Sequence, residues 1–153
     1  MMGLKRILLP TDFSEHSAAA AAYACELASK FDAELHVLNV LEFPNLPDFI
    51  VRLLPTPPVR EKRTAAAESL LAEFAGAHLS EVRPVVNAVA EGVPFLEIVR
   101  YAREKEIDLI VVSTHGRSGL AHALMGSEAE KILRSAPCPV LTVRAKGHQF
   151  EMP

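Results

Sequence analysis

The sequence predicts an α/β fold, with one doubly wound sheet of five parallel strands and helices on both faces. Two observations predict it. Short apolar runs alternate with stretches of helical period along the whole chain, which is typical of repeated βα units. Half of the 153 residues are hydrophobic and 23% are charged, a composition typical of a globular chain with one core. We therefore expect a single domain over residues 1–153.

The strands are predicted from apolar runs too short for helices. The first run, Ile7–Leu9, stops at Pro10 and suits a strand buried on both faces. The other predicted strands are residues 35–41, 82–89, 107–112 and 140–143.

Helices are predicted between the strands from apolar stripes of helical period. Asp12 and Glu15 have capping-box spacing and predict the start of the first helix. The residues expected on the inward faces of the four helices are Ala20, Tyr23, Ala24, Leu27, Ala28 and Phe31; Ala67, Leu70, Leu71, Phe74 and Ala75; Phe95, Ile98, Val99 and Ala102; and Ala129, Ile132, Leu133 and Ala136.

Two stretches lack this periodicity. Residues 42–59 contain five prolines and are predicted to form a long loop, and residues 145–153 a frayed tail.

Charge and apolar length exclude several classes of protein. The formal net charge is −3, and no stretch gathers Lys and Arg as a generic nucleic-acid binder does. No apolar segment approaches the 18 or so residues of a membrane span, and Met1–Leu9 lacks the features of a signal peptide. Cys25 and Cys138 have neither redox nor zinc spacing and predict reduced thiols. We expect a soluble, cytoplasmic protein that contacts neither nucleic acid nor membrane.

Two segments follow strands at the edge where such sheets bind ligands, residues 10–14 and 113–127. In the second, glycines permit positive φ angles and close backbone approach to a ligand. Gly126 and Ser127 open a helix, whose N-terminal N–H groups attract anions. Arg117 and nearby hydroxyls add donors, so the segment is typical of a phosphate cradle. The alternative is that Ser127 and Glu130 form a capping box that starts the helix without a ligand.

The run THGRSGLAHALMGSEAEKILRSAPCPVLTVR, which ends at Arg144, resembles the C-terminal signature of the universal stress protein family. ILLPTDFS (residues 7–14) resembles the family's opening strand and loop, and Gly92 with Pro94 its middle. The resemblance covers nearly the whole chain and implies a Rossmann-like sheet of strand order 3-2-1-4-5. The ATP-binding branch carries Gly, two residues, Gly, nine residues, then Gly and Ser or Thr. Here Gly116, Gly126 and Ser127 match, and Ser113 replaces the first glycine.

The resemblance also implies the binding residues. It places the opening loop and its acid near the adenosine, the end of the second strand against the adenine edge, and the later segment on the ribose and phosphates. The matching positions are Pro10, Thr11, Asp12, Val40, Ser113, His115, Gly116, Arg117, Gly119, Gly126, Ser127 and Glu128. Alternatives stay open: Asp12 could only cap a helix, His115 only close a turn, and Arg117 only be a solvated charge. The implied ligand is ATP with Mg²⁺ or Mn²⁺.

The chain lacks the G-x-x-x-x-G-K-[ST] phosphate loop and an evident base for an attacking water. We therefore expect no dedicated enzyme, but a nucleotide-responsive regulatory protein of the stress response with at most slow ATP hydrolysis. The alternative is a nucleotide-free interaction protein of the same fold, which Ser113 favours. An edge strand with Val140, Leu141 and Val143 and no central charge or proline is a pairing template. We expect a homodimer through it, the alternative being an edge covered by residues 145–153.

Overall fold

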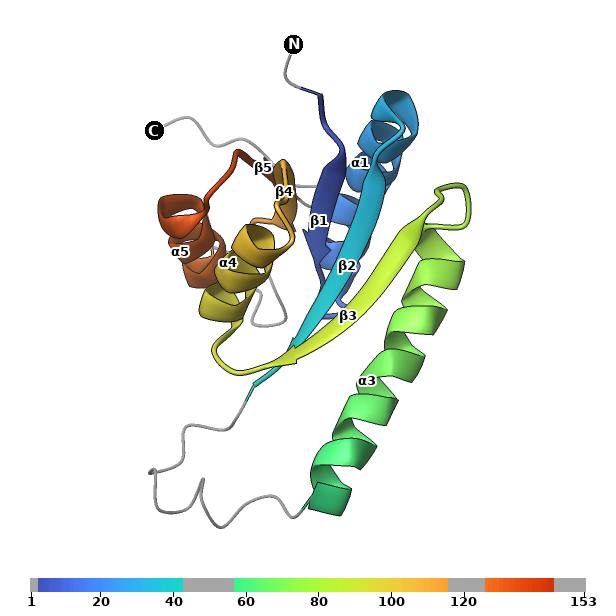
Figure 1. Ribbon diagram of the computed structural model, residues 1–153, viewed down its shortest axis with the longest axis vertical. Coiled ribbons are helices and arrows are strands. Elements are labelled where there is room, and N and C mark those ends of the chain that lie inside the picture. The colour runs from blue at the N-terminus through green and yellow to red at the C-terminus, as the bar shows by residue number, and fades with distance from the viewer. Residues whose placement is uncertain (1–2, 43–56, 116–125, 145–153) are drawn as a thin grey trace.

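The computed structural model describes residues 3–42, 57–115 and 126–144. Its strands form one five-stranded parallel sheet in the order β3-β2-β1-β4-β5 (Figure 1). The expected parallel sheet and its strand order are confirmed. The strands are β1 (Arg6–Pro10), β2 (Glu34–Leu41), β3 (Val85–Glu91), β4 (Leu109–Ser113) and β5 (Val140–Val143).

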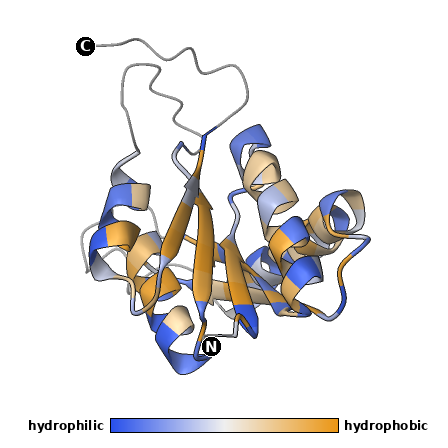
Figure 2. Ribbon diagram, turned by 90° about the horizontal axis from the view of Figure 1, so that it is seen from above, coloured by the Kyte–Doolittle hydropathy of each residue, from blue (hydrophilic) through white to orange (hydrophobic). Residues whose placement is uncertain are grey.

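Helices cover both faces of the sheet (Figure 2). They are α1 (Glu15–Phe31), α3 (Pro57–His78), α4 (Pro94–Glu104) and α5 (Ser127–Ser135). Buried residues of α1 and α3 share one core cluster with one face of the sheet. Ile98 and Ala102 of α4 and Ile132 of α5 share the other cluster with Leu8 and Ile110. The predicted double winding is therefore confirmed.

The short apolar run in β1 is fully buried, because the strand lies between two others and under helices on both faces. Ile7, Leu8 and Leu9 have no exposed surface. Ile7 and Leu9 face the α1 side and Leu8 faces the α4 side, as strand alternation requires. None of the helices formed by the described residues is long and apolar enough to cross a membrane.

The capping group of α1 differs from the prediction. Ser14, not Asp12, is the N-cap, and its hydroxyl accepts the N–H of Ser17 at 3.3 Å. Asp12 lies two residues earlier and accepts the N–H of Ser14 at 3.0 Å. The capping-box prediction was therefore wrong by two residues, because either an aspartate or a serine can cap and the spacing to Glu15 does not decide between them.

Four residues predicted to face inward are about half exposed: Tyr23, Phe31, Leu70 and Leu133. In α1 the buried stripe runs through Ser17, Ala20, Ala21, Ala24 and Ala28 instead. Small side chains let this helix lie close to the sheet, so large residues beside the stripe are left outside.

Several predicted boundaries move, and three of these shifts have a local reason. The predicted loop over residues 42–59 is too long at its end, because α3 begins at Pro57; proline is tolerated in the first turn of a helix, where its missing N–H costs nothing. β3 begins at Val85 rather than at residue 82, after the prolyl bond at Pro84. β4 begins at Leu109, since Ile107 is buried in the turn before it. Residues 43–56 and the predicted tail lie outside the described residues.

Candidate functional site

The candidate site lies where β1 and β4 end beside each other. We call it the carboxyl-edge site and define its described part as residues 10–14, 113–115 and 126–128. β1 and β4 are parallel neighbours, and the chain continues from β1 into α1 on one face while α5 covers the other face. Such a reversal of winding is where open α/β sheets bind ligands.

The backbone after β1 is held by the neighbouring strand. The N–H of Thr11 donates to the carbonyl of Leu38 at 2.9 Å, which extends the pairing of β1 with β2 beyond Pro10. The buried amide of Asn39 donates to the carbonyl of Thr11 at 2.9 Å. Pro10 and Thr11 are themselves buried, so this loop has a fixed starting direction.

Asp12 organises the turn into α1. Its Oδ1 accepts the N–H of Ser14 at 3.0 Å and the hydroxyl of Ser17 at 2.8 Å. The hydroxyl of Ser17 in turn accepts the N–H of Asp12 at 3.2 Å. Asp12 therefore supports the start of α1 without being its N-cap, and its half-buried carboxylate is fixed at the end of β1.

Phe13 carries the backbone strain of this turn. Its φ is 65°, in the left-handed region that non-glycine residues rarely adopt. Its N–H donates to the hydroxyl of Thr11 at 3.0 Å, and its ring meets Phe74 edge-on at 6.1 Å between centroids. Backbone strain of this kind persists where the surroundings fix it, and it clusters at functional sites.

The end of β4 is a tight turn built from short polar side chains. The hydroxyl of Ser113 donates to the carbonyl of His115 at 2.8 Å, and the N–H of His115 returns to that hydroxyl at 3.3 Å. Oγ1 of the buried Thr114 lies 2.9 Å from Nδ1 of His115. His115 therefore does take part in closing a turn, and Ser113, in place of the family's first glycine, supplies the bonds that close it.

Gly126 brings the start of α5 against this turn. Its N–H donates to the carbonyl of Thr114 at 2.5 Å. A Cβ at Gly126 would lie 2.8 Å from that same carbonyl oxygen, so no larger residue fits without a shift of the backbone. The φ of Gly126 is −65°, so close approach, and not a positive φ, requires the glycine.

Gly126 is also the N-cap of α5, and it has no side chain to bond to the helix. The alternative in which Ser127 caps the helix through a capping box is therefore wrong, because Ser127 is already the first helical residue. The start of α5 is positioned by the end of β4, as a helix-terminal anion site requires.

Two predicted residues lie at the margin of this arrangement. Glu128 turns toward the other helix of its face: Oε2 accepts the N–H of Phe95 at 3.1 Å, and Oε1 pairs with Lys131 at 3.0 Å. Val40 is half-buried near the end of β2, two positions beyond Leu38, which pairs with Pro10. Gly116, Arg117 and Gly119 lie outside the described residues.

Sequence reasoning missed His16, in the first turn of α1. Its ring lies 6.0 Å from that of His115, measured between centroids. Nδ1 of His16 is buried and has no hydrogen-bond partner among the described residues. A buried nitrogen without a partner costs free energy, which marks this point as a place where a ligand atom could be accepted. The position of His16 after the opening loop was the only available signal.

The fixed carboxylate, the hydroxyl-rich turn and the helix start form a set suited to a polar anionic ligand such as a nucleotide. The described residues contain no group of three or more His, Cys, Asp or Glu side chains that could hold a metal ion.

The chain matches known proteins over most of its length. The model of the universal stress protein family matches residues 3–144. Universal stress protein MJ0531 of Methanocaldococcus jannaschii is 37% identical over 150 residues, covering 92% of this chain and 82% of that protein.

Solved structures share the fold. The structure of MJ0577, from the same organism, has a TM-score of 0.79 at 26% identity and covers 96% of this chain and 100% of its own. A universal stress protein in complex with cAMP has a TM-score of 0.71 at 22% identity and covers 93% of this chain and 98% of its own. A universal stress protein family protein of Arabidopsis thaliana with AMP bound has a TM-score of 0.62 at 18% identity and covers 94% of this chain and 93% of its own.

Proposed function

This chain belongs to the universal stress protein family, and from that premise we propose that it binds ATP at the carboxyl-edge site. The observation that carries the proposal is the contact of Gly126 with Thr114, which sets the start of α5 against the turn that ends β4. The cAMP and AMP complexes of proteins with this fold support an adenine nucleotide as the ligand.

Each part of the site then has a distinct task. The fixed Asp12 carboxylate accepts hydrogen bonds from the nucleoside, and the N–H groups at the start of α5 receive phosphate oxygens. Mg²⁺ or Mn²⁺ bound to the phosphates supplies charge neutralisation. The sequence lacks the G-x-x-x-x-G-K-[ST] phosphate loop of dedicated nucleotide hydrolases, so we propose a binding protein with at most slow hydrolysis. Its nucleotide state would regulate partners in the stress response.

Nucleotide binding is tested first on the wild-type protein. Protein purified from cells is denatured, any released nucleotide is identified by mass spectrometry, and ATP, AMP and adenosine are then titrated by calorimetry. The expected result is ATP binding that is tighter than adenosine binding and that strengthens with Mg²⁺. Absence of binding by all three ligands would reject the proposal and favour the nucleotide-free interaction protein.

A variant pair locates the phosphates. Arg117→Gln removes a cation that the family resemblance assigns to the phosphate loop, and should weaken ATP binding about tenfold while leaving adenosine binding unchanged. Arg134→Gln is the control, because Arg134 is an exposed residue of α5 paired with Glu130. Equal ATP affinity in the two variants would show that Arg117 does not contact the phosphates.

We also propose that the protein is a homodimer through β5, which lies at the edge of the sheet. The carbonyl of Pro139 accepts the N–H of Ile110 in β4, and the carbonyl of Val143 accepts the N–H of Thr114 just after β4. By strand alternation, the N–H and C=O of Thr142 point away from β4, toward the open edge. A second copy could pair there about a two-fold axis.

Thr142→Pro removes the outward N–H and spares the ladder with β4, so it should convert a dimer to a folded monomer. A lysine at Leu141 would be a poorer test, since Leu141 packs against the core cluster of the α1 face. Thr142→Val, which keeps the backbone, is the control. Light scattering at micromolar concentration measures the oligomeric state. A monomeric wild type would reject the dimer, and a dimeric Thr142→Pro variant would show that the interface does not involve β5.

A further inference from the structure

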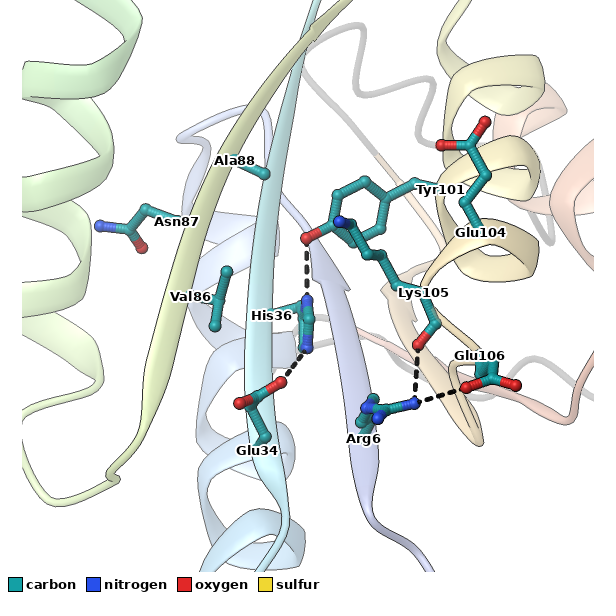
Figure 3. Close-up of a pocket in the computed structure, with 10 residues that line it drawn as sticks. All are labelled: Arg6, Glu34, His36, Val86, Asn87, Ala88, Tyr101, Glu104, Lys105 and Glu106. Carbon is teal, nitrogen blue, oxygen red and sulfur yellow. Dashed lines mark hydrogen bonds and ion pairs between the residues drawn. The ribbon is translucent and has the colours of Figure 1, made fainter.

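A pocket of about 580 Å³ lies at the opposite edge of the sheet from the carboxyl-edge site. It is lined by the starts of β1 and β2, by residues 86–88 of β3, by the last turn of α4 and by the residues after it (Figure 3). We call it the amino-edge pocket. Its volume is within the range of small-molecule sites.

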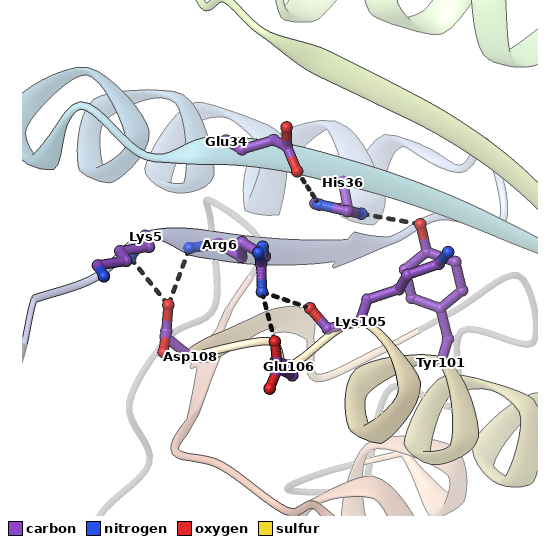
Figure 4. Close-up of polar contacts among 8 residues, drawn as sticks. All are labelled: Lys5, Arg6, Glu34, His36, Tyr101, Lys105, Glu106 and Asp108. Carbon is purple, nitrogen blue, oxygen red and sulfur yellow. Dashed lines mark hydrogen bonds and ion pairs between the residues drawn. The ribbon is translucent and has the colours of Figure 1, made fainter.

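A buried histidine links two of the lining residues. His36 of β2 is 4% exposed. Its Nε2 lies 2.6 Å from Oε1 of Glu34, and its Nδ1 lies 2.8 Å from the hydroxyl of Tyr101. Figure 4 shows the three side chains in one line, from β2 to α4. A buried imidazole is costly unless both of its nitrogens are bonded, and here both are.

The two partners fix where the protons lie. A neutral imidazole donates from one nitrogen and accepts at the other. When His36 is neutral, the carboxylate of Glu34 can only accept, so Nε2 carries the proton and Nδ1 accepts the hydroxyl proton of Tyr101. Burial, with a smaller contribution from Glu34, raises the pKa of Tyr101, which keeps that proton on the phenol. The Tyr101 oxygen therefore offers the pocket lone pairs only.

The charges around the pocket also favour a donor. Glu106 is paired with Arg6 at 3.1 Å, and the same guanidinium nitrogen donates to the carbonyl of Lys105 at 3.2 Å. Of the charged side chains that line the pocket, this pairing leaves two carboxylates, Glu34 and Glu104, and one cation, the ammonium of Lys105. A ring face with lone pairs at its rim and carboxylates nearby attracts an organic cation.

Lys105 shows where such a cation would lie. Both close-ups draw the end of its side chain beside the Tyr101 ring. Lys105 is exposed, on a flexible stem, so a ligand can displace it. The space next to the tyrosine is thus within reach of an ammonium group of the protein itself.

We propose that the amino-edge pocket is a second ligand site, which binds a small organic ammonium compound on the acceptor oxygen of Tyr101. Glu34 and His36 are positioning residues: they hold the tyrosine proton inward and so determine that the ligand must be a donor. Lys105 competes with the ligand for the same place.

The first test titrates putrescine into the wild-type protein at about pH 8, above the range in which histidines ordinarily titrate. Binding is followed by NMR at the Tyr101 and His36 signals, with butanediol as the uncharged analogue of the same chain length. Shifts with putrescine and none with butanediol are expected. Absence of shifts with putrescine, or equal shifts with both compounds, overturns the proposal.

A tyrosine pair tests the acceptor. Tyr101→Phe keeps the ring and its packing and removes one oxygen, so putrescine affinity should fall about tenfold. Tyr23→Phe is the matched control, because Tyr23 is the other tyrosine of the chain and is exposed on α1. Equal putrescine affinity in the two variants contradicts the proposal.

A glutamate pair tests the positioning role. In Glu34→Gln the amide can donate to Nε2, which lets the imidazole move its proton to Nδ1 and turns the tyrosine hydroxyl toward the pocket. Putrescine affinity should fall about tenfold although Tyr101 remains, and the imidazole nitrogen shifts should report the other tautomer. Glu26→Gln, an exposed carboxylate paired with Lys30 on α1, is the control. A changed tautomer with unchanged affinity would contradict the role.

Lys105→Met distinguishes the charge of the ligand. Removing the competing ammonium should strengthen putrescine binding severalfold, whereas a site for anions would lose affinity for inorganic phosphate in the same variant. Stronger putrescine binding supports the proposal. Weaker putrescine binding, or phosphate binding by the wild type that Lys105→Met abolishes, overturns it.

Discussion

The two edges of the sheet are built in opposite ways. At the carboxyl-edge site, contacts are made by backbone groups and by short side chains such as Ser14, Ser113 and Thr114, and the side-chain contacts of these three join residues close in sequence. At the amino-edge pocket, long side chains from β1, β2, α4 and the residues after α4 meet. The bond of Tyr101 with His36 spans 65 positions of sequence, and that of Arg6 with Glu106 spans 100.

The difference teaches what a local motif can report. A site made of backbone leaves a pattern of small residues, because only small residues permit the close approaches that it needs. A site made of side chains leaves no local pattern, since each residue is ordinary in its own segment. The predictions below test this contrast, from the largest expected effect to the smallest.

The largest effect is expected at Gly126. Gly126→Ala places a Cβ 2.8 Å from the carbonyl oxygen of Thr114, and because both partners belong to the backbone, the start of α5 must move. We expect a loss of about 1–3 kcal/mol in the free energy of unfolding, together with weaker ATP binding. Urea denaturation measures the first and calorimetry the second.

Gly76→Ala is the control for this substitution. Gly76 lies within α3, and its Cβ would meet nothing within 4 Å. Alanine there should stabilise the protein by about 0.5–1 kcal/mol through helix propensity. Similar stability in the Gly126→Ala and Gly76→Ala variants would contradict the close approach at Gly126.

A middle effect is expected at the start of α1, where capping and binding can be separated. Ser14→Ala removes the N-cap hydroxyl and should cost about 1 kcal/mol, with ATP affinity within about twofold of wild type. Asp12→Ala should lower stability by a similar amount and also weaken ATP binding. If both variants lose stability and neither loses ATP affinity, Asp12 is only a helix-start residue and the proposed nucleoside contact is wrong.

The smallest effect is a loss of stability at alkaline pH that we expect from Tyr101 in the amino-edge pocket. Burial raises the pKa of Tyr101 above its ordinary value of 10.0. The unfolded chain therefore releases this proton first, so the stabilisation is complete below about pH 10 and is lost as the pH rises through the raised value. Tyr101→Phe should lose less stability than wild type over that range, as measured by urea denaturation at stepped pH. A slope that is the same in Tyr101→Phe, Tyr23→Phe and wild type would contradict it.

Much of the fold could be predicted because the apolar pattern is local. The runs in β1 and β2 needed only their length and composition, and the alternation of runs and stripes required parallel strands. Boundaries were harder, because a proline such as Pro57 can end a loop or begin a helix. The inward face of α1 was misjudged at Tyr23, since the sheet accepts alanine more closely than the hydrophobic pattern implies.

The sequence alone determined the alternation of strands and helices, the family resemblance and the two segments at the carboxyl edge, because each depends on residues close together in the chain. Only the tertiary structure decided that Gly126 touches Thr114, that His16 stands beside His115 and that Tyr101 bonds to His36. These pairs lie on different elements, so their meeting depends on strand order, register and helix placement. A hydrogen bond requires its atoms to lie within a few tenths of an ångström of one distance, and only the packed chain specifies position to that degree.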